Sequence, residues 1–260
     1  MKKILRIIKF NFLKELNYPY EILGFIFRKI IAFGFLILFW QVLSTGNKSV
    51  LNQNQIISYF LISQAVTDLT FANDTRFGRE IQKLIKTGQI SNYLIKPMHA
   101  IKLLFLSFIG EKLTIFIYSL ITLIIGIFLQ TSTTPQAILL FIICLLLTTL
   151  TGLGINIFIG SIGFFSPEAG SIQNMFNHMT RVFSGTWIPL NLFPEYLKNI
   201  ISYSFFPVLA YYPTILLQEG SFNSSSYEIL SICAFWSLFC LGGSLLLWKK
   251  SLKSFEGVGI

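Results

Sequence analysis

The chain of 260 residues is rich in apolar residues and poor in charge, with 53% hydrophobic and 12% charged residues. So few charges cannot solvate the surface of a water-soluble domain of this size, so we expect one membrane-embedded domain over residues 1–260. The formal net charge of +9 would suggest nucleic acid as the partner of a soluble protein. Here we attribute it to residues that flank membrane spans, and no nucleic-acid partner is expected.

The first 20 residues predict an amphipathic helix that lies on the membrane surface. Ile4, Ile8 and Phe12 alternate with basic residues such as Lys2 and Lys9. Such a helix suits the boundary between lipid headgroups and acyl chains. It either anchors the orientation of the chain or docks a partner, and the sequence leaves both open.

Six apolar stretches approach the length of about 20 residues that an α-helix needs to cross a hydrocarbon core of about 30 Å. Their apolarity is continuous, which predicts helices and excludes the alternating strands of a barrel. Four glycines of the fourth stretch predict close helix packing: Gly152, Gly154, Gly160 and Gly163. The predicted fold is an all-α polytopic membrane protein with six transmembrane helices, over 22–43, 56–71, 106–129, 137–158, 172–190 and 229–248.

The positions of Lys and Arg predict the orientation of these spans. Seventeen of them flank one side, whereas only Lys48 and Lys198 fall on the other and Arg181 lies inside a span. Because basic residues concentrate in cytoplasmic segments, both termini and residues 73–102 are expected in the cytoplasm of a cell whose plasma membrane holds the chain.

Residues 76–86 predict a short amphipathic helix in this cytoplasmic segment. One helical face carries Phe77, Ile81, Leu84 and Ile85, and Gly88 is placed to end the helix in a left-handed cap. A short helix that is apolar on one side and charged on the other could fit a groove in a cytoplasmic partner or lie on anionic lipid, and composition does not separate the two. The remaining surface carries Arg76, Arg79, Glu80, Lys83 and Lys86.

Polar residues inside the apolar stretches are candidates for a transport pathway. Asp68 in the second span and Arg181 in the fifth lie at similar depth, so we expect them to pair or to share a polar pathway. Alternatively, Asp68 reaches the interface and Arg181 snorkels. Asn177 and His178 are further pathway candidates. His178 would titrate, bind substrate or be a satisfied interior group.

Residues 191–220 predict an outer-leaflet hairpin of short helices between the last two spans. Prolines divide this stretch into apolar pieces too short to cross, and its many aromatic residues are typical of a membrane interface. We therefore expect a hairpin that is re-entrant or lies flat, and an ordinary extracytoplasmic loop is the alternative. The dividing prolines are Pro194, Pro207 and Pro213.

Two segments resemble motifs of the type-2 permease subunits of ATP-binding-cassette (ABC) transporters. Residues 85–97, Ile-Lys-Thr-Gly-Gln-Ile-Ser-Asn-Tyr-Leu-Ile-Lys-Pro, resemble the pattern Ile-x-x-Gly-x-Leu-x-x-Tyr-Leu-Leu-x-Pro. Residues 184–194, Ser-Gly-Thr-Trp-Ile-Pro-Leu-Asn-Leu-Phe-Pro, resemble Ser-Gly-x-x-Ile-Pro-Leu-x-x-Phe-Pro, a match that includes Pro189, Phe193 and Pro194. The polar stretch 173–181 departs from the family, because it matches none of these motifs.

The resemblance implies that helix 76–86 and Gly88 form a coupling helix on a separate nucleotide-binding ATPase subunit, present in two copies per complex. It further implies a second permease chain, identical or a sister subunit, and a hairpin after the fifth span that closes the outer end of the pathway. The chain lacks a G-x-x-x-x-G-K-[ST] phosphate loop. We expect it to bind no cofactor, with ATP and Mg on the partner, and to contact membrane lipids.

The sequence therefore favours the permease subunit of an ABC exporter that moves a possibly amphiphilic substrate by alternating access, without being an enzyme itself. The alternative is a membrane-embedded enzyme acting on a lipid-like substrate, which would need clustered carboxylates or His and Cys ligands. The 11 acidic residues are scattered instead. A channel or structural subunit is a third reading that leaves the two motifs unexplained.

Overall fold

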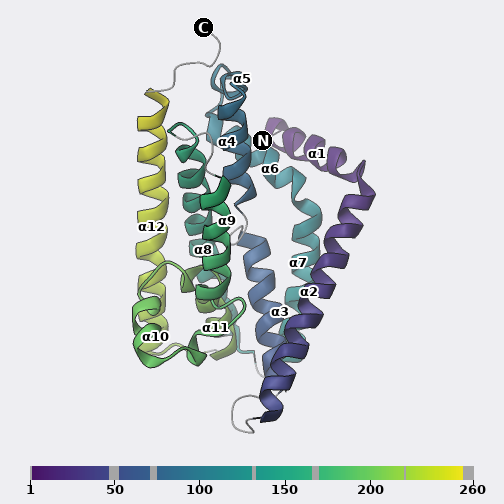
Figure 1. The fold of residues 1–260 in the computed structure, drawn as a ribbon, viewed down its shortest axis with the longest axis vertical. Helices are drawn as coiled ribbons and strands as arrows, with labels where there is room; N and C mark the ends of the chain where they lie inside the picture. Colours follow the sequence, from purple (N-terminus) through teal and green to yellow (C-terminus); the bar gives the residue numbers. More distant parts are fainter. Residues whose placement is uncertain are drawn as a thin grey trace.

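A computed structural model describes residues 2–46, 53–70, 75–130, 133–165, 170–219 and 221–253 of the chain. Every regular element in these residues is a helix, which confirms the predicted all-α class (Figure 1). Lys48, residues 73–74 of the predicted coupling segment and residue 220 of the predicted hairpin lie outside the described residues. The helices are α1 (Lys2–Leu16), α2 (Pro19–Gly46), α3 (Gln53–Thr70), α4 (Arg76–Lys86), α5 (Ser91–Leu94), α6 (Ala100–Glu111), α7 (Leu113–Leu129), α8 (Pro135–Ile162), α9 (Gly170–Phe183), η1 (Leu190–Leu192), α10 (Glu195–Ser202), η2 (Pro207–Leu209), α11 (Tyr211–Glu219) and α12 (Ser224–Lys253).

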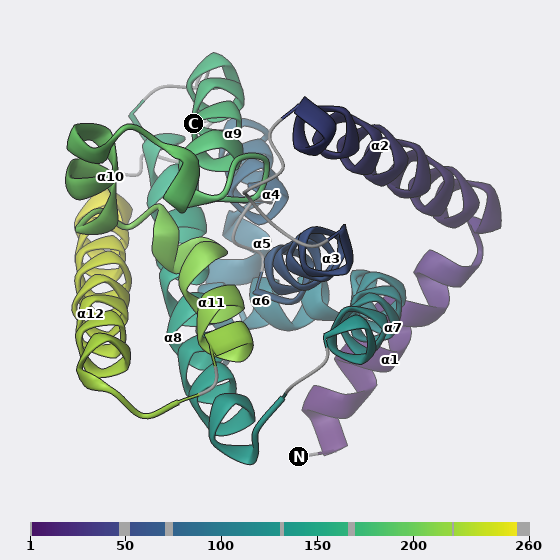
Figure 2. The ribbon, with the colours of Figure 1, turned by 90° about the horizontal axis from the view of Figure 1, so that it is seen from below.

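The long helices run between the two ends of an elongated bundle (Figure 1). One end carries α1, α4, α5 and the C-terminal end of α12, and we call it the α4 end. The opposite end carries α10 and the start of α12, and we call it the α10 end. α8 packs against α12, α4, α11 and α3, whereas α2 lies at the edge of the bundle (Figure 2).

Three helices and one bent helix pair are long and apolar enough to cross a membrane within the described residues, and they match the first, third, fourth and sixth predicted spans. The third span, predicted as continuous over 106–129, is instead the pair α6 and α7, which meet at 62°. The bend lies beside Gly110, where a Cβ atom would be 2.6 Å from the carbonyl oxygen of Ile8 because α1 crosses α6 there. The straight spans are Pro19–Trp40, Pro135–Ile162 and Ser224–Lys253.

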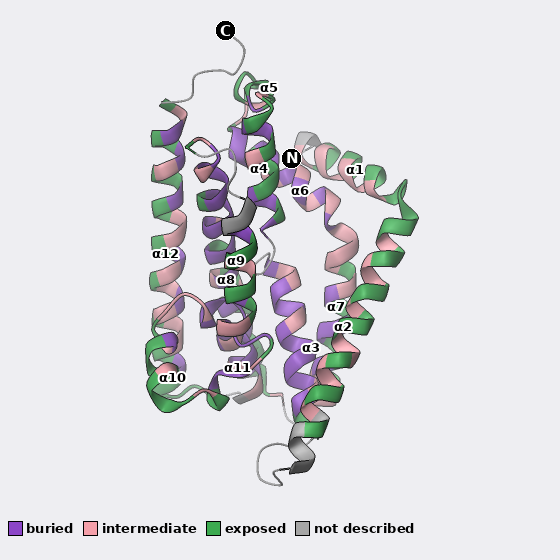
Figure 3. Ribbon diagram, viewed as in Figure 1, coloured by how far each residue is buried: buried purple, intermediate pink, exposed green. Residues whose placement is uncertain are grey.

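α3 lies inside the bundle rather than on its outer surface (Figure 3). Ser58, Ser63 and Thr67 are buried along it, and the Ser58 hydroxyl donates a hydrogen bond to the carbonyl of Gly126 on α7 at 2.9 Å. A helix surrounded by protein can carry polar side chains that lipid would reject. α3 therefore occupies the place of the second predicted span, although it is not among the helices apolar enough to span by composition.

α9 is shorter than the fifth predicted span, 172–190. Its 14 residues cover about 21 Å, which is less than a hydrocarbon core of about 30 Å. The helix ends because Gly185 adopts a φ of +85°, where a Cβ atom would also lie 2.9 Å from the hydroxyl of Tyr59. That hydroxyl donates a hydrogen bond to the Gly185 carbonyl at 2.7 Å. The predicted continuation of a helix to residue 190 is wrong.

The glycines of α8 allow its neighbours to come close, as predicted. A Cβ atom on Gly154 would lie 2.5 Å from the carbonyl carbon of Cys240 on α12. A Cβ atom on Gly160 would lie 2.9 Å from Cβ of Ile81 on α4. α8 is therefore the helix against which both α12 and α4 are positioned.

Candidate functional site

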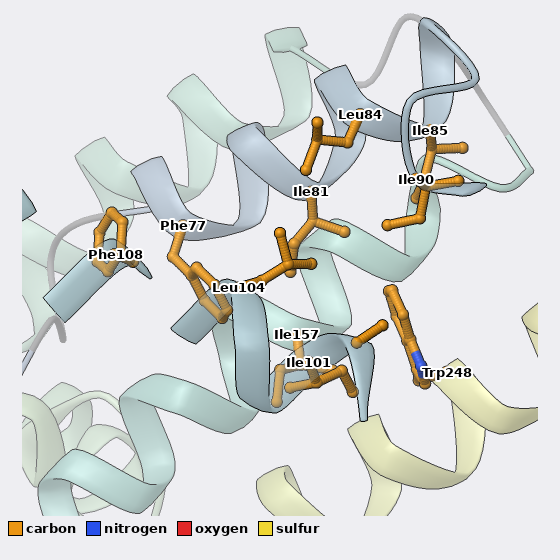
Figure 4. Packing of buried hydrophobic residues seen from close by; sticks show 11 residues of the cluster. Phe77, Ile81, Leu84, Ile85, Ile90, Ile101, Leu104, Phe108, Ile157 and Trp248 are labelled. Atoms are coloured by element: carbon orange, nitrogen blue, oxygen red, sulfur yellow. The ribbon is translucent and has the colours of Figure 1, made fainter. Parts of the chain in front are cut away.

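The apolar face of α4 packs against the chain's own helices at the α4 end (Figure 4). Four of its side chains are at most 6% exposed: Phe77, Ile81, Leu84 and Ile85. They join a cluster with Leu104 of α6, Ile157 of α8 and Trp248 of α12. The predicted helix and its apolar face are confirmed. Because α6, α8 and α12 cover this face, only the charged face of α4 and the segment that follows the helix are open to a partner or to lipid.

A side chain of α8 caps the N-terminus of α4. The amide of Gly78 belongs to the first turn and has no partner within its helix. It donates a hydrogen bond to Oδ1 of Asn156 at 3.1 Å, and Asn156 is 1% exposed. One turn further, Nε2 of Gln82 donates to the carbonyl of Ile159 at 2.7 Å. These two polar contacts and the buried cluster fasten α4 to α8.

The C-terminus of α4 turns into residues 87–97, a segment in which only Ile90 is buried, and we call this segment the apex. Gly88 has a φ of +70°, which confirms the predicted left-handed cap. The amide of Ile90 donates to the carbonyl of Leu84 at 3.0 Å, which holds the turn. None of the four residues of α5 is buried, and Ile95 after it is 81% exposed. The segment that carries the first family motif is thus available to a partner.

The charged face of α4 lines a cavity of about 1120 Å³ at the same end of the bundle. The other walls come from α1, α2, α6, α7 and α9. Each charged residue of α4 is exposed and belongs to this lining: Arg76, Arg79, Glu80, Lys83 and Lys86. The two faces of α4 therefore differ in role, since the apolar face is buried against other helices and the charged face borders the cavity.

α1 borders this cavity and packs on α6. The hydroxyl of Thr114 donates to the Glu15 carboxylate at 3.1 Å, and Nζ of Lys14 lies 3.7 Å from the Glu111 carboxylate. Partial burial raises the pKa of the Glu15 carboxyl, and the Thr114 hydrogen bond and the charge of Lys112 oppose that rise. Several apolar side chains of α1 stay exposed, as a surface helix requires: Leu5, Phe10, Leu13 and Leu16.

Asp68 pairs with Lys29 of α2, not with Arg181. The ammonium of Lys29 lies 2.8 Å from both carboxylate oxygens of Asp68, and Gln64 donates to the same carboxylate at 3.1 Å. The two side chains of the pair are 21% and 15% exposed. The Arg181 guanidinium lies instead 5.8 Å from the ring of Trp187. The predicted Asp68–Arg181 pair is therefore wrong in this structure.

The polar stretch of α9 reaches α4 through two amides one turn apart. Gln173 donates to Oε1 of Gln82, and Nδ2 of Asn177 donates to the Thr75 hydroxyl at 2.9 Å. His178 and Arg181 are exposed on other parts of the helix. Of the four predicted pathway residues, Asp68 thus contacts Lys29 of α2 and Asn177 contacts Thr75 before α4, whereas His178 and Arg181 are exposed.

The segment 191–219 forms short helices at the α10 end, and its prolines start them. Pro189 precedes η1, Pro194 precedes α10, Pro207 opens η2 and Pro213 lies in the first turn of α11. The ring of Phe193 lies 6.4 Å from that of Phe183 at the end of α9.

The hairpin is tied to the spanning helices. The indole of Trp236 on α12 donates to the carbonyl of Tyr203 at 2.9 Å, and the amide of Tyr211 donates to the carbonyl of Ser184 at 3.0 Å. The second family motif thus forms the junction of α9, α3 and α11.

The sequence does not reveal the contacts of three polar residues: Lys29, Lys112 and Asn156. Lys29 counts among the flanking basic residues, yet it lies ten residues into α2 and pairs with Asp68. Asn156 is the one amide side chain in the apolar stretch 137–158, which was a usable signal. Lys112 is only 6% exposed, at the bend between α6 and α7, and a bend cannot be read from apolar content.

Among the described residues, no group of three or more His, Cys, Asp or Glu side chains could hold a metal ion. In the comparison with protein families, the model described as "ABC-2 family transporter protein" matches residues 25–259. The comparison with curated proteins gives no match.

Proposed function

The chain belongs to the ABC-2 family of transporter proteins as a membrane permease component of an ABC transporter, and we propose that it serves an ATP-driven exporter. ATP and Mg would bind to the associated ATPase subunits, two per complex, and not to this chain. The permease would change between inward and outward access as those subunits bind and hydrolyse ATP.

The α4 end would face the cytoplasm of a plasma membrane, with both termini on that side. The charged residues of α4 and the C-terminal lysines of α12, Lys249, Lys250 and Lys253, lie at this end, in keeping with the preference of basic residues for cytoplasmic segments. The hairpin of short helices would then lie in the outer leaflet and re-enter it beside α3 and α8, which α11 contacts.

A second permease chain, identical or a sister subunit, would complete the membrane assembly. α2 crosses by length and apolarity, but its spanning segment has no buried residue in this chain. α3 is already surrounded by the chain's own helices, but α9 exposes His178 and Arg181, which lipid would reject. A pair of chains would allow six crossings per chain, because the partner would cover polar side chains that otherwise face lipid.

The apex is the proposed contact for the ATPase, and the fastening of α4 to α8 is the observation that carries the proposal. A force on the apex would pass through α4 to α8 by the Gly78–Asn156 and Gln82–Ile159 hydrogen bonds. α8 in turn packs on α12, α11 and α3. Movement of an ATPase subunit would thus reach the spanning helices directly.

The proposal is tested by purifying the tagged chain from its native membranes and measuring ATP hydrolysis and subunit composition. We expect a subunit with a phosphate loop to copurify and the complex to hydrolyse ATP. Ile95→Asp, in the apex, should release that subunit, whereas Ile200→Asp is a matched control because Ile200 is 65% exposed at the α10 end. A complex that survives Ile95→Asp, or that loses the ATPase in both variants, would refute the docking site. A chain purified without any ATPase would refute the function.

A further inference from the structure

The cavity beside α4 is lined by an excess of positive charge. Its described lining includes seven basic side chains and four acidic ones, contributed by α1, α2, α4, α6 and the α6–α7 bend. The basic residues are Lys14, Arg28, Arg76, Arg79, Lys83, Lys86 and Lys112, and the acidic residues are Glu15, Glu21, Glu80 and Glu111. A concave surface of one dominant sign concentrates ligands of the opposite charge.

Two of the four acids are already engaged by protein groups. Glu111 lies 3.7 Å from the ammonium of Lys14, and Glu15 accepts the hydrogen bond from Thr114. The cavity also holds three arginines from two helices, Arg28 on α2 and a pair on α4. Guanidinium groups bind phosphate oxygens with two parallel hydrogen bonds, which makes them the preferred residue for phosphate groups.

Two buried polar side chains belong to the wall of the cavity. Lys112 is 6% exposed, with its ammonium 5.2 Å from the ring centroid of Phe108, and it adds a positive charge to the wall. Gln173 is 1% exposed, and its Oε1 has no hydrogen-bond partner among the described residues. Burying an amide oxygen is costly unless a hydrogen-bond donor meets it.

The same cavity has an apolar part beside the edge helix of the bundle. Ile22 and Phe25 of α2, Phe108 of α6 and Ile115 of α7 line it together with the charges. α2 exposes large apolar side chains outward, such as Phe27 at 66% and Ile30 at 59%. Charges and apolar surface in one cavity match a molecule that has both a charged head and an apolar tail.

We infer that this cavity binds the phosphate headgroup of an anionic amphiphile, held by Arg28, Arg76, Arg79, Lys83 and Lys86 with its tail along Ile22 and Phe25. The inference rests on the proposed function and names the class of its substrate. Because α4 joins the apex to this basic wall, a displacement of α4 by the ATPase would change the affinity for the headgroup. Transport would require such a change between the two states.

The test measures binding of a short-chain fluorescent phosphatidic acid to the purified permease–ATPase complex in neutral detergent without nucleotide. An equally labelled phosphatidylcholine reports binding through the tail alone. K83Q/K86Q removes two exposed charges from the cavity, and K249Q/K250Q removes two exposed lysine charges that do not line it. We expect K83Q/K86Q to weaken phosphatidic acid binding by about 25-fold, since each cation near an anionic group contributes about fivefold.

Phosphatidylcholine binding should be unchanged in both variants, and K249Q/K250Q should bind phosphatidic acid as the unmodified complex does. Equal losses in the two double variants, or phosphatidic acid binding no tighter than phosphatidylcholine, would overturn the inference. Displacement of the probe by millimolar inorganic phosphate alone would overturn the assignment to an amphiphile. ATP hydrolysis is measured on the same samples. A complex that assembles and hydrolyses ATP yet fails these tests overturns this inference and leaves the proposed function standing.

Discussion

The side-chain cap on α4 gives a prediction with a definite size. Asn156→Leu keeps the approximate volume of the side chain but removes the acceptor of the Gly78 amide, which lies 3.1 Å from Oδ1. A buried donor left without a partner costs about 1–3 kcal/mol. That cost falls on the closed state of α4 against α8, so the free energy of local opening should fall by the same amount.

Hydrogen–deuterium exchange of peptides covering Arg76–Lys86 measures this opening. Exchange should become about 5- to 150-fold faster in Asn156→Leu, as 1–3 kcal/mol requires. Ser161→Ala is the matched control, because the buried Ser161 hydroxyl donates only to the Ile157 carbonyl of its own helix at 2.7 Å, which keeps its backbone partner. Unchanged exchange in Asn156→Leu, or equal acceleration in both variants, would refute the cap as the fastening of α4.

Two further predictions concern stability, measured as the free energy of unfolding by denaturant in mixed micelles. Gly154→Ala should destabilise by about 1–3 kcal/mol, because its new Cβ meets backbone of α12 at 2.5 Å and cannot be accommodated by a side-chain rotation. Gly242→Ala meets nothing within 4 Å and should be neutral or stabilising, so equal losses would contradict the close α8–α12 packing. Asp68→Asn leaves Lys29 without its counter-ion at 2.8 Å and should cost about 1–3 kcal/mol, less than a fully buried pair. The exchange Lys29→Asp with Asp68→Lys should recover most of that loss, and a double variant no better than Asp68→Asn would show that the pair does not join α2 to α3.

The helices with the strongest local signals could be predicted from the sequence. α2, α8 and α12 are continuous apolar runs, and α4 has a regular apolar face that ends at Gly88 in the required left-handed conformation. The length of an apolar run, the period of an apolar face and a capping glycine all depend on residues that are close in the sequence, so they can be predicted from it. The bend at Lys112 could not be predicted in the same way. A continuous apolar run shows that a helix is buried or lies in lipid, but it does not show whether that helix is straight or bent.

The wrong predictions at the candidate site concern which side chains contact each other across different helices. The period of α4 correctly identified an apolar face, but only the fold shows that α6, α8 and α12 cover it. Asp68 was matched to Arg181 by depth alone, while Lys29, at comparable depth in another apolar run, was counted with the flanking charges. Every charged residue within a span is an equally good candidate for such a pair, and depth cannot choose among them.

The division of α4 into two faces links the two proposals physically. Its buried face makes α4 part of the body formed by α6, α8 and α12, so the helix cannot move at the apex without moving that body. Its charged face belongs to the cavity, whose other walls lie on α1, α2, α6, α7 and α9, and of these helices α2 contacts the rest of the chain mainly through α3. A force on the apex would therefore move α4 and α6 relative to the α2 wall of the cavity. If Asn156→Leu frees α4 from α8, it should lower transport per ATP hydrolysed while leaving phosphatidic acid binding intact, because the basic residues of the wall are unchanged.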